Sequence, residues 1–221
     1  MKFPAWSYSA LNSWETCPRR HAEIKLFKRV PDEKGEAALW GTTAHAAFEN
    51  RLKHKTPFPV WGASWEPVCQ RLESTKGTLQ VEQKIAITAS FQPCGFFDRK
   101  VEVWCRAVAD VAVYSSRALL TVDWKTGKFK EDTDQLRLSA AMQLSHHPEI
   151  EQATILYAWL QSGRTTVERL TRADVPGIWS DFLPRVERMR IGIETERFDP
   201  KPSGLCRKHC PVTSCIENGR R

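Results

Sequence analysis

Two apolar segments that lie close together in the chain each carry a carboxylate, and this feature restricts the fold most. Residues 107–113 read Ala-Val-Ala-Asp-Val-Ala-Val, so Asp110 is surrounded by apolar neighbours on both sides. Residues 119–125 read Leu-Leu-Thr-Val-Asp-Trp-Lys and carry their charges only at the end. Apolar runs rich in β-branched residues are typical of strands covered on both faces. The pattern therefore predicts two buried strands in a sheet flanked by helices.

A carboxylate among apolar side chains needs a cation, hydrogen-bond donors or a metal ion, because an unpaired buried charge is costly. Side chains alternate between the faces of a strand, so Asp123 and Lys125 project to the same side. If the two strands are neighbours, Asp110 can share that side. Two carboxylates and a backbone carbonyl form the oxygen-rich site that suits Mg²⁺ or Mn²⁺. A structural salt bridge at Asp110 is the alternative.

The periodicity of apolar residues and the positions of turn residues predict the remaining elements. Helices are expected over residues 8–28, 36–53, 63–72, 133–146 and 176–193. Strands are expected over residues 78–88, 101–114, 119–125, 153–160 and 165–170. The order of helices, three strands, a helix, two strands and a helix predicts an α/β fold with a mixed sheet between helices.

Four motifs in a fixed order resemble the RecB-like branch of the PD-(D/E)XK nuclease superfamily. They are Gly41-Thr42-Thr43-Ala44-His45, Ala109-Asp110, Val122-Asp123-Trp124-Lys125 and Gln135. The chain is similar to the CRISPR-associated exonuclease family and its phage-encoded relatives from Tyr8 to Cys215. The resemblance implies a restriction-endonuclease-like core in the order α-β-β-β-α-β, with a helical N-terminal extension. It also implies a metal-dependent DNase, an exonuclease rather than an endonuclease.

The resemblance assigns a role to each motif residue. His45, Asp110, Asp123 and the carbonyl of Trp124 would be ligands of Mg²⁺ or Mn²⁺, whereas Lys125 and Gln135 would complete the catalytic set. Considered by itself, a lone histidine on an apolar helix face is more often a core residue. Relatives often have a tyrosine four residues after the glutamine, where this chain has Ser139. Glu82 is a candidate for a second metal, although a solvated strand charge is the preferred interpretation.

Three of the seven cysteines cluster near the C-terminus, at Cys206, Cys210 and Cys215. Clustered cysteines in a chain that looks cytosolic indicate ligation rather than disulfides. With Cys17 as the fourth ligand, they resemble the iron–sulfur staple of the same family, which implies a 4Fe–4S cluster. The spacing differs from the family pattern, and His209 makes zinc a reasonable alternative. The absence of any metal is a further one.

Length and composition limit the architecture. A chain of 221 residues suffices for one domain. We divide it into a helical N-terminal part (1–75), a catalytic core (76–195) and a cysteine-rich tail (196–221) that packs back on the N-terminal helix. We find neither a signal peptide nor the roughly 20 apolar residues of a membrane helix, so a cytoplasmic protein without a membrane partner is expected.

The formal net charge of +7 suits DNA as a partner, since basic residues release counterions from phosphates. Arg19 and Arg20, beside Cys17, are candidate DNA contacts, although such charges often serve solubility alone. Gln135 is a third candidate, because it lies in the first turn of an expected helix and helix N-termini attract phosphate. Trp14 and Trp124 are candidates for stacking on bases.

Three hypotheses about function follow. The first is a Mg²⁺- or Mn²⁺-dependent DNase that processes single strands or duplex ends in recombination or repair, with a recombination or annealing protein as a candidate partner. The second is a nucleic-acid-binding or scaffold protein that keeps the nuclease fold but does little chemistry. The complete set of His45, Asp110, Asp123 and Lys125 disfavours it. The third is an unrelated zinc-stapled module with a structural buried aspartate.

Overall fold

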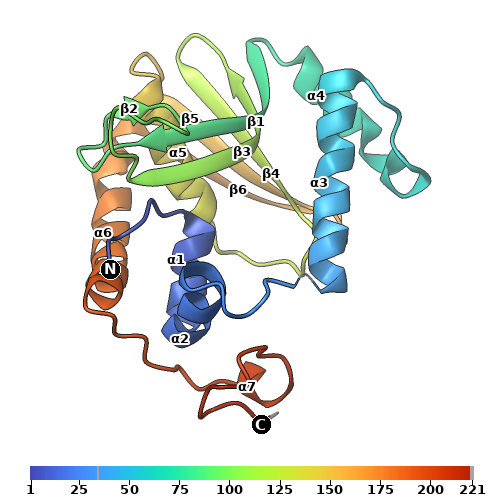
Figure 1. Cartoon of the computed structure of the whole chain (residues 1–221). Coiled ribbons are helices and arrows are strands. Elements are labelled where there is room, and N and C mark those ends of the chain that lie inside the picture. Colours follow the sequence, from blue (N-terminus) through green and yellow to red (C-terminus); the bar gives the residue numbers. More distant parts are fainter. Residues whose placement is uncertain (34, 220–221) are drawn as a thin grey trace. The chain divides into compact units, whose positions relative to one another are not determined.

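The computed structural model describes residues 1–33 and 35–219 (Figure 1). Two compact units make up the chain. The sheet unit is Lys34–Trp179, and the terminal unit combines Met1–Glu33 with Ser180–Arg221. This division differs from the boundaries expected at residues 75 and 195. Among the residues described, no helix combines the length and the apolar character needed to cross a membrane.

The sheet unit contains a mixed sheet of six strands in the order β2-β1-β3-β4-β5-β6. Their bounds are Thr78–Ile87 (β1), Pro93–Cys94 (β2), Cys105–Tyr114 (β3), Ala118–Lys125 (β4), Gln152–Trp159 (β5) and Arg164–Thr171 (β6). Only β4 and β5 pair in parallel, and they are joined through helix α5 (Asp134–His146). This order and the flanking helices confirm the expected fold class. The expected strand over 101–114 begins only at Cys105, and β2 was not predicted from the sequence.

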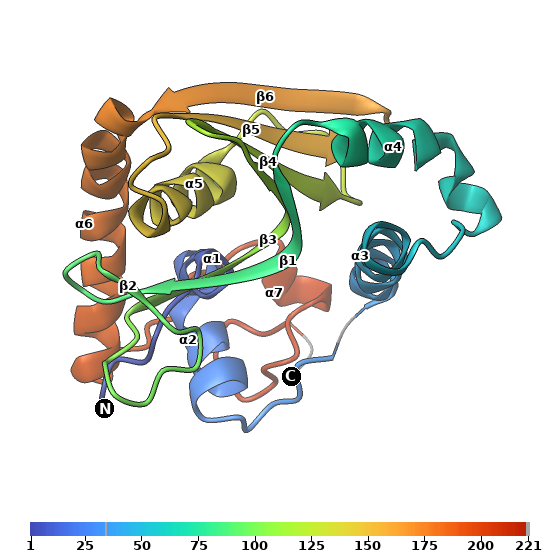
Figure 2. The same cartoon turned by 90° about the horizontal axis from the view of Figure 1, so that it is seen from above.

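Helices cover both faces of the sheet. Helices α3 (Glu36–His54) and α4 (Glu66–Ser74) lie against one face, with the 3₁₀ turn η2 (Val60–Trp65) before α4. The sheet curves around α5 on the other face (Figure 2). On the first face, Phe48 of α3 stacks on Trp124 of β4 with 4.0 Å between ring centroids. Val111, Val113 and Val122 belong to the same buried cluster. The apolar positions of the two charged strands thus hold α3 in place.

The terminal unit begins with α1 (Tyr8–Thr16), α2 (Pro18–His21) and the π-helical turn η1 (Ala22–Leu26). The single helix expected over 8–28 is therefore interrupted. Cys17 is extended, with φ −167°, and its Sγ accepts a hydrogen bond from the N–H of Arg20. Pro18 has no N–H to continue the ladder, so it begins a new helix instead.

Helix α6 (Val175–Glu194), from Ser180 onward, and the short helix α7 (Leu205–Lys208) complete the terminal unit. Arg185 of α6 donates two hydrogen bonds to the Glu15 carboxylate, at 2.8 and 2.7 Å. A Cβ on Gly192 would lie 2.4 Å from the Trp14 ring, so only glycine permits this approach. The first and last segments of the chain are thus packed together within this unit.

Candidate metal centre

Three acidic residues occupy corresponding positions on neighbouring strands. In the β1–β3 ladder, Val81 pairs with Val111 and Gln83 with Ala109, so Glu82 lies opposite Asp110. The β3–β4 ladder ends at the pair Val111–Val122, and the next positions along it are Asp110 and Asp123. Beyond this point the N–H of Trp124 donates to Asp110 Oδ2 at 2.8 Å. The carboxylates therefore gather where the backbone pairing of β3 and β4 ends.

Glu82 has a left-handed backbone conformation, with φ 54°. On its N-terminal side, Val81 packs toward the α3–α4 cluster, whereas Gln80 borders a hollow on the Tyr114 side. On its C-terminal side, the odd-numbered Gln83 accepts a hydrogen bond from the Tyr114 hydroxyl. The alternation of β1 is thus reversed at Glu82. Since bulky residues pay to adopt positive φ, this is a strained position at the centre of the site.

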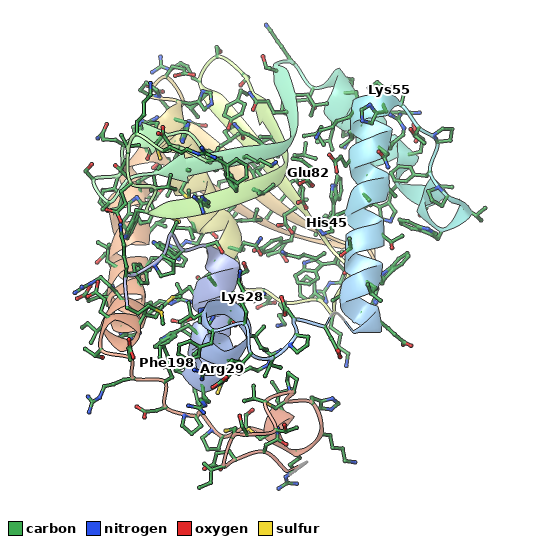
Figure 3. The ribbon with its side chains drawn as sticks, in the orientation of Figure 1. Lys28, Arg29, His45, Lys55, Glu82 and Phe198 are labelled. Carbon is green, nitrogen blue, oxygen red and sulfur yellow. The ribbon has the colours of Figure 1, made fainter. Side chains whose placement is uncertain are left out.

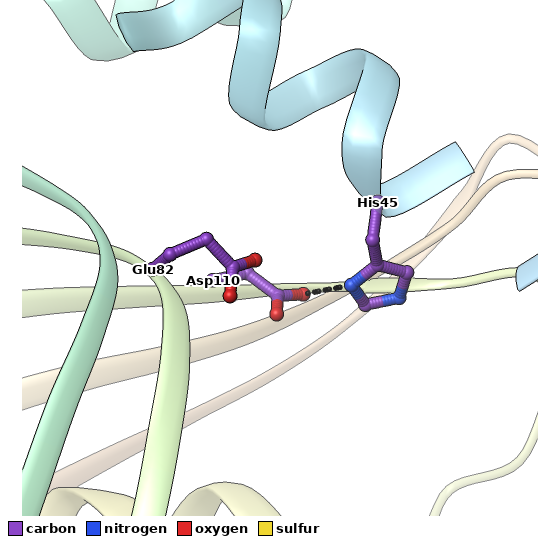
Figure 4. Close-up of side chains that lie close together, drawn as sticks. All are labelled: His45, Glu82 and Asp110. Atoms are coloured by element: carbon purple, nitrogen blue, oxygen red, sulfur yellow. Dashed lines mark ion pairs between the residues drawn. The ribbon is translucent and has the colours of Figure 1, made fainter. Parts of the chain in front are cut away.

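His45 reaches the carboxylates from α3. Its Nδ1 lies 3.2 Å from Asp110 Oδ2. One ligand atom each of His45, Glu82 and Asp110 lies within 4.8 Å of the others. Figure 3 shows His45 extending from α3 toward Glu82 on β1, and Figure 4 shows the three side chains converging. In the described part of the chain, no other group of three His, Cys, Asp or Glu ligand atoms is this tight.

The three ligands line an open hollow of about 510 Å³. Gly41 and Glu49 also line it, one turn before and one turn after His45 on the same face of α3. A Cβ on Gly41 would lie 3.2 Å from Thr126 Oγ1, so the small residue lets α3 approach the end of β4. The hollow leaves the centre accessible from outside.

Lys125 and Gln135 surround the buried Asp123. Lys125 Nζ lies 2.7 Å from Asp123 Oδ2 and donates to Gln135 Oε1 at 2.8 Å. Gln135 Nε2 donates to Asp123 Oδ1 at 3.2 Å. Gln135 stands in the first turn of α5, so the start of the helix and the end of β4 meet at this carboxylate. The amide thus fixes the lysine and the aspartate relative to each other.

The centre carries excess negative charge. Burial and then the charge of Asp110 raise the pKa of Asp123 to about 6, against the opposing effect of Lys125. Burial and Asp110 also raise the pKa of Glu82. Burial alone would lower the pKa of His45, but its hydrogen bond to Asp110 and the nearby carboxylates outweigh burial and raise it. The raised pKa values of Asp123, Glu82 and His45 all indicate a cluster of carboxylates that a nearby cation would stabilise.

The donor set fits a divalent ion. Carboxylate oxygens suit Mg²⁺ and Mn²⁺, and an imidazole nitrogen is acceptable to Mn²⁺ rather than to Mg²⁺. His45, Glu82 and Asp110 are close enough to share one ion, and Asp123 adjoins them along the strand register. The structure thus brings together His45, Asp110, Asp123, Lys125 and Gln135, all named from the sequence. The roles of these residues and of the Trp124 carbonyl stay predictions.

Other expectations fare differently. Glu82 is half-buried within the ligand group, not the solvated strand charge that the sequence favoured. Glu49 was missed, although its four-residue spacing from His45 on one helix face could have revealed it. Trp14 and Trp124 are buried, so the prediction that they stack on bases is wrong. Ser139, which stands where relatives often have a tyrosine, is buried on α5.

The cysteines named as ligands all lie in the terminal unit. Cys17 Sγ accepts from the N–H of Lys201 at 3.5 Å, which ties the N-terminal segment to the tail. Cys210 and Cys215 are buried with Val212 against Val30, and Cys206 is partly exposed. None of the seven cysteines, all within the described residues, forms a disulfide. Ligation by the four cysteines stays a prediction. The sequence suggested that the three scattered cysteines are small core residues; Cys69 and Cys105 are buried, whereas Cys94 is partly exposed.

Comparison with known proteins bears on the whole chain. A family model described as the PD-(D/E)XK nuclease superfamily matches residues 5–215. The crystal structure of SSO0001 is similar with a TM-score of 0.51 and 14% identity, covering 99% of this chain and 89% of that one. A candidate exonuclease from Eubacterium rectale is similar with a TM-score of 0.55 and 16% identity, covering 91% and 85%. At these identities the likeness concerns the fold. No match was found among curated proteins.

Proposed function

Because the chain belongs to the PD-(D/E)XK nuclease superfamily, we propose that it is a Mg²⁺- or Mn²⁺-dependent DNA exonuclease that processes DNA ends in recombination or repair. The observation that carries the proposal is the position of Asp110. Its carboxylate contacts His45, binds the Trp124 N–H and stands in register between Glu82 and Asp123. A cation at this point would meet ligands from α3, β1 and β3 together.

The residues have separable roles in phosphodiester hydrolysis. A divalent ion held by His45, Glu82, Asp110 and Asp123 would polarise the scissile phosphate and acidify a water molecule. Lys125, fixed by Gln135, presents its ammonium beside the carboxylates, where it stabilises the charge that develops on the phosphate. Gln135 keeps that ammonium from folding away from the site. The open hollow admits the substrate.

Two observations support the finer parts of the proposal. The candidate exonuclease from Eubacterium rectale shares the fold, and its description supports action at DNA ends by analogy. The imidazole of His45 supports Mn²⁺ as an effective ion beside Mg²⁺. The second candidate function, a nucleic-acid-binding scaffold with little chemistry, is favoured only by the buried Ser139, which replaces the tyrosine of relatives.

The decisive experiment compares linear and circular DNA, single-stranded and duplex, with end labels, in Mg²⁺, Mn²⁺ or EDTA. The wild type should degrade linear DNA in a metal-dependent way and spare circular DNA, and Asp123→Ala should abolish this. Asp199→Ala, which removes an exposed carboxylate in the terminal unit, is the matched control. Cleavage of circles would make the protein an endonuclease, and binding without cleavage would favour the scaffold function.

We also propose that Cys17, Cys206, Cys210 and Cys215 hold a 4Fe–4S cluster that staples the terminal unit. The burial of Cys210 and Cys215 and the contact between Cys17 and Lys201 support it. Thiolates bound to iron would link the two ends of the chain. Anaerobically purified protein should contain iron and labile sulfide, both lost in Cys210→Ser. Zinc without iron would favour the alternative site that includes His209.

A further inference from the structure

A strip of cations and aromatic rings continues from the metal centre along the face shared by β1 and β3. Val108 lines the hollow together with Glu82 and Asp110. Lys84 is the register partner of Val108, and Arg106 lies two residues farther along β3. Because alternate residues of paired strands share a face, Lys84 and Arg106 emerge on the side of the hollow. Arg106 is four residues from Asp110, or about 13 Å along the strand.

The loop that follows β2 adds two rings to these cations. Lys84 Nζ lies 6.0 and 5.7 Å from the ring centroids of Phe96 and Phe97, and the Arg106 guanidinium lies 5.6 and 6.0 Å from them. Arg106 Nε donates to the Phe96 carbonyl at 2.8 Å, which fixes both groups. We call the four residues Lys84, Phe96, Phe97 and Arg106 the basic–aromatic strip.

Within the described part of the sheet unit, the basic–aromatic strip has an exposed ring and no carboxylate that neutralises its cations. The Phe97 ring is 70% exposed, although a large apolar side chain normally gains by burial. In the residues that the structure describes, neither Lys84 nor Arg106 forms an ion pair. The carboxylate of Asp98 accepts hydrogen bonds from the N–H groups of Lys100 and Val101, so it shapes the loop and leaves the cations uncompensated.

We propose that the basic–aromatic strip binds single-stranded DNA and directs it to the metal centre, an inference that rests on the proposed function. Cations and an exposed ring that alternate over a short distance match phosphates and bases that alternate along one strand. A duplex buries the faces of its bases, so Phe97 selects a single strand. The strip attracts DNA without a metal ion, whereas the carboxylates at its end repel phosphate until a cation is bound.

The test measures binding of fluorescent oligo-dT in EDTA, so it does not depend on cleavage. Phe97→Ala should weaken binding about tenfold, since a stacked base contributes that much, and Phe97→Trp should preserve it. Lys84→Ala combined with Arg106→Gln should lower the slope of log affinity against log salt by about 1.4. Arg169→Gln, an exposed charge on β6, should change neither quantity.

The outcomes separate this inference from the proposed function. If wild-type protein does not bind oligo-dT in EDTA, or if Phe97→Ala binds as the wild type does, the strip does not hold a single strand. If Phe97→Ala lost as much affinity for blunt duplex DNA as for oligo-dT, the strip would be a general DNA-binding surface. That result would also overturn the inference. In either case metal-dependent cleavage by the wild type and its loss in Asp123→Ala would leave the proposed function standing. In support, Phe97→Ala should raise KM for single-stranded DNA and leave kcat unchanged.

Discussion

The carboxylate of Asp110 accepts a hydrogen bond from the backbone N–H of Trp124, with 2.8 Å between Oδ2 and nitrogen. The backbone pairing of β3 and β4 ends one pair earlier, at Val111–Val122. The Asp110 side chain thus provides the next hydrogen bond between the two strands. The same oxygen lies 3.2 Å from His45 Nδ1. One aspartate therefore joins two strands and a helix at the point where we place the ion.

This double role predicts that the two simplest substitutions of Asp110 differ in stability but not in activity. Asp110→Asn keeps an oxygen that can accept from Trp124 but loses the charge, so cleavage should fall at least about a hundredfold. Asp110→Ala also leaves the buried N–H unpaired, which costs about 1–3 kcal/mol of folding free energy. Urea unfolding in EDTA, beside a cleavage assay, measures both quantities. Cleavage by Asp110→Asn at the wild-type rate would show that the Asp110 carboxylate is not a ligand of the catalytic ion.

The buried charge of Asp123 predicts how the stability of the metal-free protein depends on pH. Burial, followed by Asp110, raises its folded pKa to about 6, above the unfolded value of 3.8. The folded state therefore binds the proton more tightly, so this group lowers stability as the pH rises from about 4 to above 6. Asp123→Asn should stabilise the protein in EDTA at pH 7.5, by up to about 3 kcal/mol, and have no effect near pH 4.

The measurement for Asp123→Asn is chemical unfolding at a series of pH values, with Asp199→Asn as the control for an exposed aspartate. A stabilisation that is the same at pH 4 and pH 7.5 would show that packing, not ionisation, is responsible.

Lys125 should raise the rate of cleavage without contributing to the affinity for the ion. Its ammonium lies 2.7 Å from Asp123 Oδ2 and competes with a cation for that carboxylate. Lys125→Met should therefore bind Mn²⁺ as tightly as the wild type or more tightly, while kcat falls about a hundredfold or more. Calorimetric Mn²⁺ titration and single-turnover cleavage distinguish the two effects. Lys128→Met, an exposed lysine in the loop after β4, is the control. Weakened Mn²⁺ binding would argue against this role.

Glu82 and Glu49 both line the hollow, but only Glu82 belongs to the group of ligand atoms within 4.8 Å. Glu82→Gln should therefore weaken Mn²⁺ binding about tenfold or more, and Glu49→Gln should have a smaller effect because Glu49 pairs with Lys53 at 2.7 Å. The two variants remove the same charge a short distance apart, so each controls for the other. Equal losses would mean that the hollow attracts the ion by its net charge alone.

The sequence predicted the parts of the structure that depend on local pattern. The apolar runs around Asp110 and Asp123 predicted the buried strands, and the period of two placed Asp123 and Lys125 on one side. Glu82 could not be placed in this way, because its role depends on the β1–β3 register and on a backbone reversal that the alternation of Leu79, Val81, Ile85 and Ile87 does not reveal. The break at Cys17-Pro18 was readable in principle, since proline interrupts helices.

The positive φ of Glu82 means that the backbone of β1 cannot be made regular without moving this metal-ligand candidate. Glycine would adopt that conformation at no steric expense, whereas glutamate gives up roughly 1 kcal/mol or more to do so. A chain selected only for thermal robustness would therefore tend to lose the glutamate and straighten β1. Thermal stability therefore favours replacement of Glu82, whereas affinity for the ion favours its retention.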